Sequence, residues 1–149
     1  MKRYPAYDPP EYVGWTPDPV LVAEFGETAR RDPARRKVLE ALDAAALLEL
    51  YAGLLRTRLH DVALKRWVRT GVISKAWLGT GEEAATVGPV HALDRTQDII
   101  APMIRNAGAC AEMGMPVADS FRSYLGTADS PSGGRDLHHG SLAARVLQP

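Results

Sequence analysis

The longest amphipathic pattern of the chain lies in residues 43–70. Asp43 is placed to cap the N-terminus of a helix there, and Gly71 is placed to end it. Such a helix would be about 40 Å long. Exposed apolar area of this extent usually marks an interface, so we doubt that the chain is a stable monomer. The apolar positions recur at helical spacing: Leu47, Leu48, Tyr51, Leu54, Leu55, Leu59 and Val62.

The segment before this helix has a different pattern. Residues 1–32 hold many prolines and are predicted to be irregular. Interleaved aromatic residues favour an extended arm that packs on its own domain or on a neighbouring subunit, and a mobile tail is the alternative. Asp32 and Pro33 predict a short helix that ends near Leu42. We therefore predict an arm with a short helix in residues 1–42 and a partial domain in residues 43–149.

Shorter elements follow the long helix. Two glutamates after the turn at residues 79–81 open a predicted helix that runs to about Leu93 and is interrupted by Pro89. Further helices are predicted at 106–113 and 117–125, the second ended by Gly126. One short strand is expected near residues 98–103 and a second near residues 72–78. A polar, glycine-rich loop occupies 127–140.

The predicted strand at 98–103 leads to the candidate chemistry. Its apolar run ends at Arg105, and small residues follow at once. An arginine beside a helix start is a candidate phosphate site, because its planar cation binds phosphate oxygens in pairs. The alternative is a buried strand that ends in a surface arginine. His138 and His139 lie in the glycine-rich loop, and one such histidine near pH 7 could act as an acid, a base or a phosphate partner.

Composition narrows the class of protein. Lys+Arg and Asp+Glu both number 18, so the formal net charge is zero, and neither a nucleic-acid nor a membrane-surface protein is indicated. The single cysteine, Cys110, excludes an intramolecular disulfide and fits a reducing compartment. We find neither a secretory signal nor a transmembrane run, and we expect the protein in the cytoplasm. No set of ligands with metal-site spacing is present.

The order of the motifs resembles the α subunit of the thiamine-diphosphate-dependent 2-oxo acid dehydrogenase E1 component. This family includes the pyruvate, branched-chain 2-oxo acid and acetoin dehydrogenases. The resemblance covers about residues 43–149. It rests on residues 50–58 (LYAGLLRTR), 79–85 (GTGEEAA), 102–108 (PMIRNAG), 114–116 (GMP), 124–126 (YLG) and 134–138 (GRDLH).

The resemblance implies roles for individual residues. Arg105 matches the family arginine that holds the cofactor diphosphate. Ile104 stands where the family usually has a tyrosine with the same role, and Ala107 stands where it usually has a histidine. Glu83 matches a family glutamate near the active site. The loop with His138 and His139 matches a stretch that borders the same cavity, so these histidines are the catalytic candidates.

The resemblance also implies a fold, cofactors and partners. We expect the N-terminal portion of an α/β thiamine-diphosphate-binding fold, mostly helical in this segment. The Mg²⁺ ligands of the family lie further along than this chain, and another catalytic group belongs to the β subunit. The chain is therefore expected to be part of a split or truncated E1 α subunit. It would work with a C-terminal α portion, an E1 β subunit and a lipoyl-bearing E2. The alternative is a non-catalytic helical module that docks on such an assembly.

Overall fold

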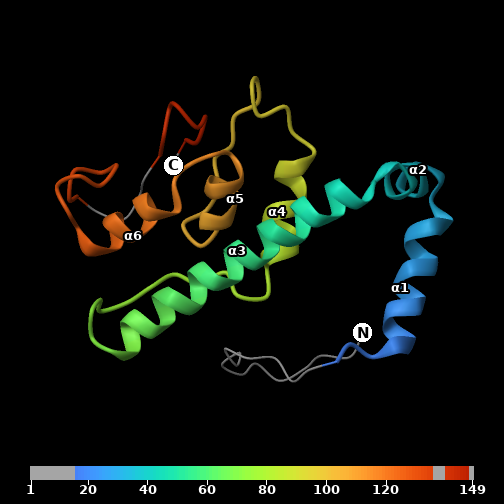
Figure 1. Ribbon diagram of the computed structural model, residues 1–149, viewed down its shortest axis with the longest axis horizontal. Coiled ribbons are helices and arrows are strands. Elements are labelled where there is room, and N and C mark those ends of the chain that lie inside the picture. The colour runs from blue at the N-terminus through green and yellow to red at the C-terminus, as the bar shows by residue number, and fades with distance from the viewer. Residues whose placement is uncertain (1–15, 136–139, 148–149) are drawn as a thin grey trace. The chain divides into compact units, whose positions relative to one another are not determined.

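The computed structural model describes residues 16–135 and 140–147. The chain divides into two compact units, Met1–Leu48 and Glu49–Pro149. The predicted boundary after residue 42 stays a prediction. Within the described ranges the regular elements are helices (Figure 1): α1 (Pro19–Arg31), α2 (Pro33–Ala41), α3 (Ala44–Arg69), α4 (Glu83–His91), α5 (Ala107–Glu112) and α6 (Val117–Leu125).

The prediction that residues 1–32 are irregular is wrong for residues 19–31, which form α1. Asp18 caps this helix by accepting a hydrogen bond from the Val20 N–H at 2.9 Å. Pro19 occupies the first helical turn, where a missing N–H costs nothing and the fixed φ favours the helix. The same Asp-Pro pair recurs at Asp32 and Pro33, where it begins α2 as predicted. Residues 1–15 lie outside the described part of the chain.

α3 confirms the predicted long helix and both of its ends. The Asp43 carboxylate accepts a hydrogen bond from the Ala46 N–H at 2.8 Å. Gly71 adopts a left-handed φ of 75°, and its N–H donates to the Val68 carbonyl at 3.1 Å. The face of α3 that is buried carries small and polar residues together with one leucine: Gly53, Thr57, His60, Asp61 and Leu64.

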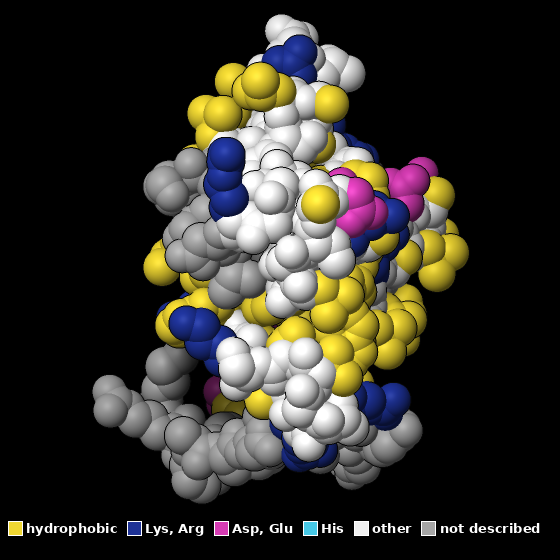
Figure 2. All heavy atoms as spheres, turned by 90° about the vertical axis from the view of Figure 1, so that its left-hand side faces the viewer, with side chains coloured by type: hydrophobic (Ala, Val, Ile, Leu, Met, Phe, Trp, Pro, Cys, Tyr) yellow, Lys and Arg dark blue, Asp and Glu magenta, His cyan; other side chains and the backbone are white. Residues whose placement is uncertain are grey.

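The predicted apolar stripe of α3 lies largely on the exposed side of the helix. Leu48 is 68% exposed, Tyr51 62% and Leu59 56%. Other hydrophobic side chains are visible at the surface in the space-filling view (Figure 2). Because the buried face includes small residues such as Gly53, α3 approaches its neighbours closely, while its large apolar side chains stay exposed.

The core of the second unit forms where α4, α5, the loop after α5 and the segment around Val146 meet. Its buried residues are Val90, Ala109, Cys110, Met113, Met115 and Val146. Two glycines allow α3 to pack against this core. A Cβ added at Gly108 would meet Thr57 Oγ1 at 2.3 Å, and one added at Gly53 would meet Val87 Cγ1 at 2.8 Å. The helices predicted at 106–113 and 117–125 are confirmed as α5 and α6, and Gly126 ends α6 with a φ of 65°.

The predicted strands at 98–103 and 72–78 are wrong within residues 16–135 and 140–147, where no strand is formed. Ile100 makes an isolated parallel bridge with Val146, and Ser141 makes an antiparallel one with the same residue. A strand needs a neighbour of similar length to satisfy its backbone groups. Ile100 forms two backbone hydrogen bonds with residues 145–147, and the pairing does not extend further into a ladder. The α/β fold of a complete family member is therefore not visible in this chain.

None of the helices in the described ranges combines the length and the apolar character that a membrane span requires.

Candidate functional site

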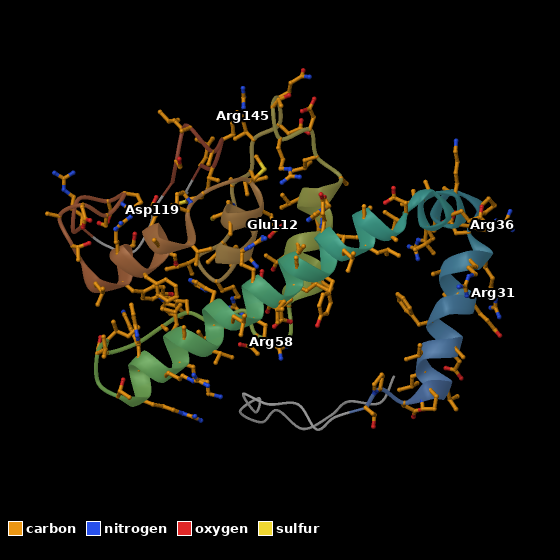
Figure 3. All side chains as sticks on the ribbon, viewed as in Figure 1. Arg31, Arg36, Arg58, Glu112, Asp119 and Arg145 are labelled. Atoms are coloured by element: carbon orange, nitrogen blue, oxygen red, sulfur yellow. The ribbon has the colours of Figure 1, made fainter. Side chains whose placement is uncertain are left out.

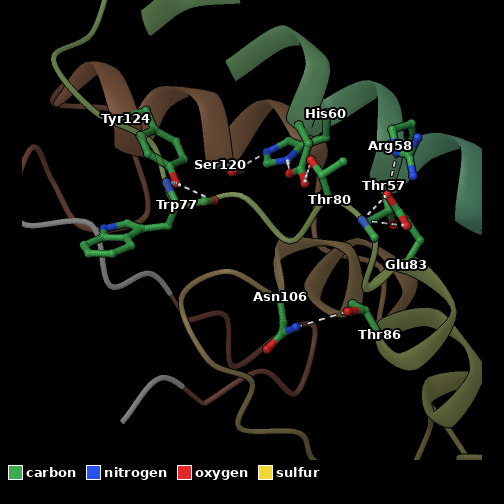
Figure 4. A network of polar contacts seen from close by, with 12 residues as sticks. Thr57, Arg58, His60, Trp77, Thr80, Glu83, Thr86, Asn106, Ser120 and Tyr124 are labelled. Atoms are coloured by element: carbon green, nitrogen blue, oxygen red, sulfur yellow. Dashed lines mark hydrogen bonds and ion pairs between the residues drawn. The ribbon is translucent and has the colours of Figure 1, made fainter. Parts of the chain in front are cut away.

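Two segments that are separated by 18 residues in the sequence lie against each other in the second unit. They are the turn at residues 79–83 and the segment 102–106 that precedes α5. A Cβ added at Gly79 would lie 2.7 Å from the Arg105 carbonyl oxygen. The Asn106 side-chain amide donates to Thr86 Oγ1 in α4 at 3.1 Å (Figure 4). We call residues 79–83 and 102–106 together the Arg105 wall.

Glu83 fixes the turn of this wall. Its carboxylate accepts hydrogen bonds from the Gly81 N–H at 3.0 and 3.1 Å and from Arg58 Nε at 2.5 Å. Burial by itself would raise the pKa of Glu83, but the hydrogen bonds from Arg58 and Gly81 outweigh it and hold the pKa below its ordinary value. The same hydrogen bond raises the pKa of Arg58. Glu83 is therefore an ionised residue engaged in positioning the turn (Figure 4).

Arg105 has a more open environment. Its side chain is 47% exposed, and Nη1 lies 3.4 Å from Glu82 Oε1, whose side chain is 46% exposed. Ile104, beside it, is half-buried, and Ala107 begins α5. An exposed ion pair of this kind contributes little to stability, so the guanidinium can change partners at small cost.

A buried polar network of α3 residues contacts the turn at residues 79–83. This network is not among the features predicted from the sequence. Asp61 Oδ2 accepts a hydrogen bond from Thr80 Oγ1 at 3.0 Å, and His60 Nε2 lies 2.8 Å from Ser120 Oγ in α6. Both α3 residues are buried and hydrogen-bonded, which agrees with a structural rather than catalytic role. In the sequence, this network could be recognised from the polar residues Thr57, His60 and Asp61, which lie on the face of α3 away from its apolar stripe.

Tyr124 of α6 holds the segment that leads into the turn. Its hydroxyl accepts a hydrogen bond from the Trp77 N–H at 3.0 Å and donates one to the Trp77 carbonyl at 3.3 Å (Figure 4). Burial raises the pKa of Tyr124, so the hydroxyl keeps its proton and can donate. Both ends of the segment 77–83 are therefore anchored by side chains of other helices.

A second polar cluster surrounds Glu112 of α5, labelled in Figure 3. Its buried carboxylate forms an ion pair with Arg56 and lies 2.9 Å from His91 Nε2. Arg95 donates to the Glu112 carbonyl oxygen at 3.0 Å. Each cation in this cluster already has a partner, so we interpret it as a packing device between α3, α4 and α5.

The structure brings together only part of the predicted site. Glu83 and Arg105 contribute to one wall, with Ile104 beside them. His138 and His139 lie outside the described residues. Among residues 16–135 and 140–147, no group of three or more His, Cys, Asp or Glu side chains is placed to hold a metal ion.

Comparisons with known proteins agree with the motif order. A model of the family described as "Dehydrogenase E1 component" matches residues 53–149. The 2-oxoisovalerate dehydrogenase subunit alpha of Bacillus subtilis (strain 168) is 33% identical over 116 residues, which are 76% of this chain. The chain spans 35% of the length of that relative. No solved structure matches the chain. The chain belongs to the dehydrogenase E1 component family of thiamine-diphosphate-dependent 2-oxo acid dehydrogenases. Within this family it corresponds to the N-terminal part of the α subunit.

Proposed function

We propose that this chain forms part of an E1 α subunit and contributes Arg105 to the binding of thiamine diphosphate for oxidative decarboxylation of a 2-oxo acid. The observation that carries the proposal is the position of Arg105. Its backbone is packed against Gly79, while its guanidinium is half-exposed with one exposed carboxylate nearby. An arginine held by its backbone and loosely paired at its head group suits a phosphate ligand.

The residues of the Arg105 wall fit an anionic group. The guanidinium offers several N–H donors, and the Glu82 contact at 3.4 Å is long enough to be exchanged for a shorter one. When bound, thiamine diphosphate supplies the carbon nucleophile and the electron sink of the reaction. The chain's own part is to bind and orient. The proposal includes Mg²⁺, bound with the cofactor through ligands outside this chain.

The other predicted residues have complementary roles in this proposal. Glu83 keeps the turn at 79–83 in place through Arg58 and the Gly81 N–H. Ile104 would give the cofactor an apolar neighbour where the family usually has a tyrosine. His138 and His139 would face the substrate cavity and transfer or stabilise a proton near neutral pH.

The partners in this proposal are an E1 β subunit and a C-terminal α portion, with a lipoyl-bearing E2 as acceptor of the acyl group. The exposed apolar face of α3 supports the need for such partners, because large apolar side chains in contact with water favour association. We propose the cytoplasm as the location of the assembly.

Reconstitution tests the proposal. The 149-residue chain is mixed with a C-terminal α portion and a β subunit, and binding of thiamine diphosphate is measured by calorimetry with and without the chain. Arg105→Ala should weaken binding by about tenfold or more, because a charge-assisted contact worth about 1.5–3 kcal/mol is lost. Arg36→Ala, which removes an exposed arginine of α2, is the matched control and should leave the affinity unchanged. Equal affinity with and without the chain would overturn the proposal.

The second candidate is a non-catalytic module that docks on an E1-type assembly. It is favoured by the exposed face of α3 together with Ile104 and Ala107, which replace the usual tyrosine and histidine of the resemblance. The same reconstitution separates the two. A module would join the assembly, as seen in sedimentation, while thiamine diphosphate affinity stayed independent of Arg105.

A further inference from the structure

An open cavity of about 490 Å³ lies in the second unit, and no residue of the Arg105 wall lines it. It is formed between the segment that follows α3 and the end of α6 with the loop after it. Ser74 and Lys75 come from the first of these, Tyr124 from α6, and Gly134 and Arg135 from the loop. Ligand-binding pockets of proteins commonly have volumes of about 300–1,000 Å³, so the space suits a small organic ligand.

Among the described residues, the charged side chains that line the cavity are both cationic. Lys75 and Arg135 are the charged residues among those that line it, and neither forms an ion pair with any residue of the described ranges. The ammonium of Lys75 lies 5.9 Å from the centre of the Trp77 ring. Asp129, one of the acidic residues of the same loop, is paired with Arg122 at 3.2 Å. Two cations beside one cavity repel each other unless an anion lies between them.

The walls that carry the two cations are held in place. The double hydrogen bond between Tyr124 and the Trp77 backbone fixes the segment that bears Lys75. On the other wall, the Gly134 N–H donates to Ser130 Oγ at 3.0 Å. A Cβ added at Gly134 would lie 2.9 Å from the Gly126 carbonyl oxygen, so the loop packs directly on the end of α6. Arg135 is the residue next to Gly134 in the sequence.

We propose that this cavity binds a small phosphate ester, whose phosphate group lies between Lys75 and Arg135. The guanidinium would supply paired N–H donors and the ammonium a compact charge, which together match a dianion better than a single carboxylate. The Ser74 hydroxyl adds a neutral donor, and Val72, Ile73 and Leu125 offer apolar surface for the rest of the ligand. This site shares no residue with the Arg105 wall.

The experiment uses the complete 149-residue chain and inorganic phosphate as the probe. Amide chemical shifts are followed by NMR during titration, with acetate as the comparison anion. We expect saturable shifts at Ser74, Gly134 and Arg135, with phosphate bound more tightly than acetate. Lys75→Gln and Arg135→Gln should each weaken phosphate binding by about tenfold or more. The double variant Arg36→Gln, Lys37→Gln removes two exposed cations of α2 and should not change it.

One further variant separates this inference from the proposed function. In Arg105→Ala, phosphate shifts at Ser74 and Gly134 should persist even if shifts near residue 105 disappear. Circular dichroism of each variant checks that the helices are retained. Phosphate binding that is unchanged in Lys75→Gln with Arg135→Gln, or shifts confined to the Arg105 wall, would overturn the proposal of a second anion site.

Discussion

Individual glycines determine how closely the helices of the second unit approach one another. At Gly108, a Cβ would collide with the Thr57 side chain, with Oγ1 at 2.3 Å and Cγ2 at 2.7 Å. Gly108→Ala should therefore destabilise the chain by about 1–3 kcal/mol through overpacking. Urea denaturation followed by circular dichroism measures this change.

Gly88 in α4 gives the matched control for that substitution. A Cβ at Gly88 meets nothing within 4 Å, and the residue lies inside a helix. Gly88→Ala should destabilise the chain by less than about 1 kcal/mol, because no packed side chain obstructs the added methyl group and only the ring of the following Pro89 restricts the backbone. Equal destabilisation by both substitutions would contradict the role assigned to the contact between Gly108 and Thr57.

Glu83 should make the free energy of unfolding of the chain depend on pH in the acidic range. Its pKa in the folded chain is lowered, so its contribution is present above the ordinary glutamate pKa and is lost as pH falls through the folded value. Glu83→Gln should lower the free energy of unfolding by about 1–3 kcal/mol at neutral pH and flatten its decline toward acid pH. Denaturant unfolding at a series of pH values provides the measurement. Glu82→Gln removes a half-exposed carboxylate and should change stability by less than about 1 kcal/mol.

The sequence predicts the candidate site only partly at the scale of residues. Arg105 and Glu83 could be found because each lies in a short motif with a chemical reason for its spacing. His60 and Asp61 could not be given their partners, since Ser120 and Thr80 are brought to them by packing of α6 and of the turn. Contacts between distant segments depend on tertiary structure that no local pattern contains.

At the scale of elements, helix ends were predictable where a cap and a glycine mark them. Asp43 and Gly71 delimit α3, and Gly126 ends α6. The many prolines of residues 1–32 indicate irregular structure and so conceal the helix signal of the Asp18-Pro19 pair at α1. The same kind of pair, Asp32-Pro33, correctly predicts α2. The prediction of the two strands is wrong for a different reason. An apolar run such as 99–104 has strand character, but a sheet also needs a partner strand.

The capping interaction at the start of α3 leads to a testable element-scale prediction. Asp43→Ala removes the hydrogen bond to the Ala46 N–H and should cost about 1 kcal/mol of stability. Thermal unfolding followed by circular dichroism would show a lower midpoint. Glu49→Ala, an exposed change inside the same helix, is the control and should alter stability by less than about 0.5 kcal/mol. The cap would be unimportant if the two variants melted alike.

At the scale of the whole molecule, α3 combines two faces of different character. The small and polar face packs on its own unit through Gly53, Thr57 and Leu64, whereas Tyr51, Leu55 and Leu59 remain largely in contact with water. A core of modest size is thus combined with an apolar surface that no described residue covers. Hydrophobic association through this surface would remove that area from water and stabilise the helix at the same time.

Polar substitution of this face should separate association from folding. Leu55→Gln with Leu59→Gln should preserve helix content, because neither side chain is buried in the isolated chain. The double variant should bind the C-terminal α portion and β subunit at least about tenfold more weakly, as loss of the burial of two leucines predicts. Sedimentation velocity of the mixtures measures the association, and the exposed Val38→Gln with Leu39→Gln pair in α2 is the control. If the α3 variant lost helix content instead, these leucines would belong to the fold rather than to an interface. If it associated as tightly as the unaltered chain, the partner surface would lie elsewhere, and the wide apolar face of α3 would need another explanation.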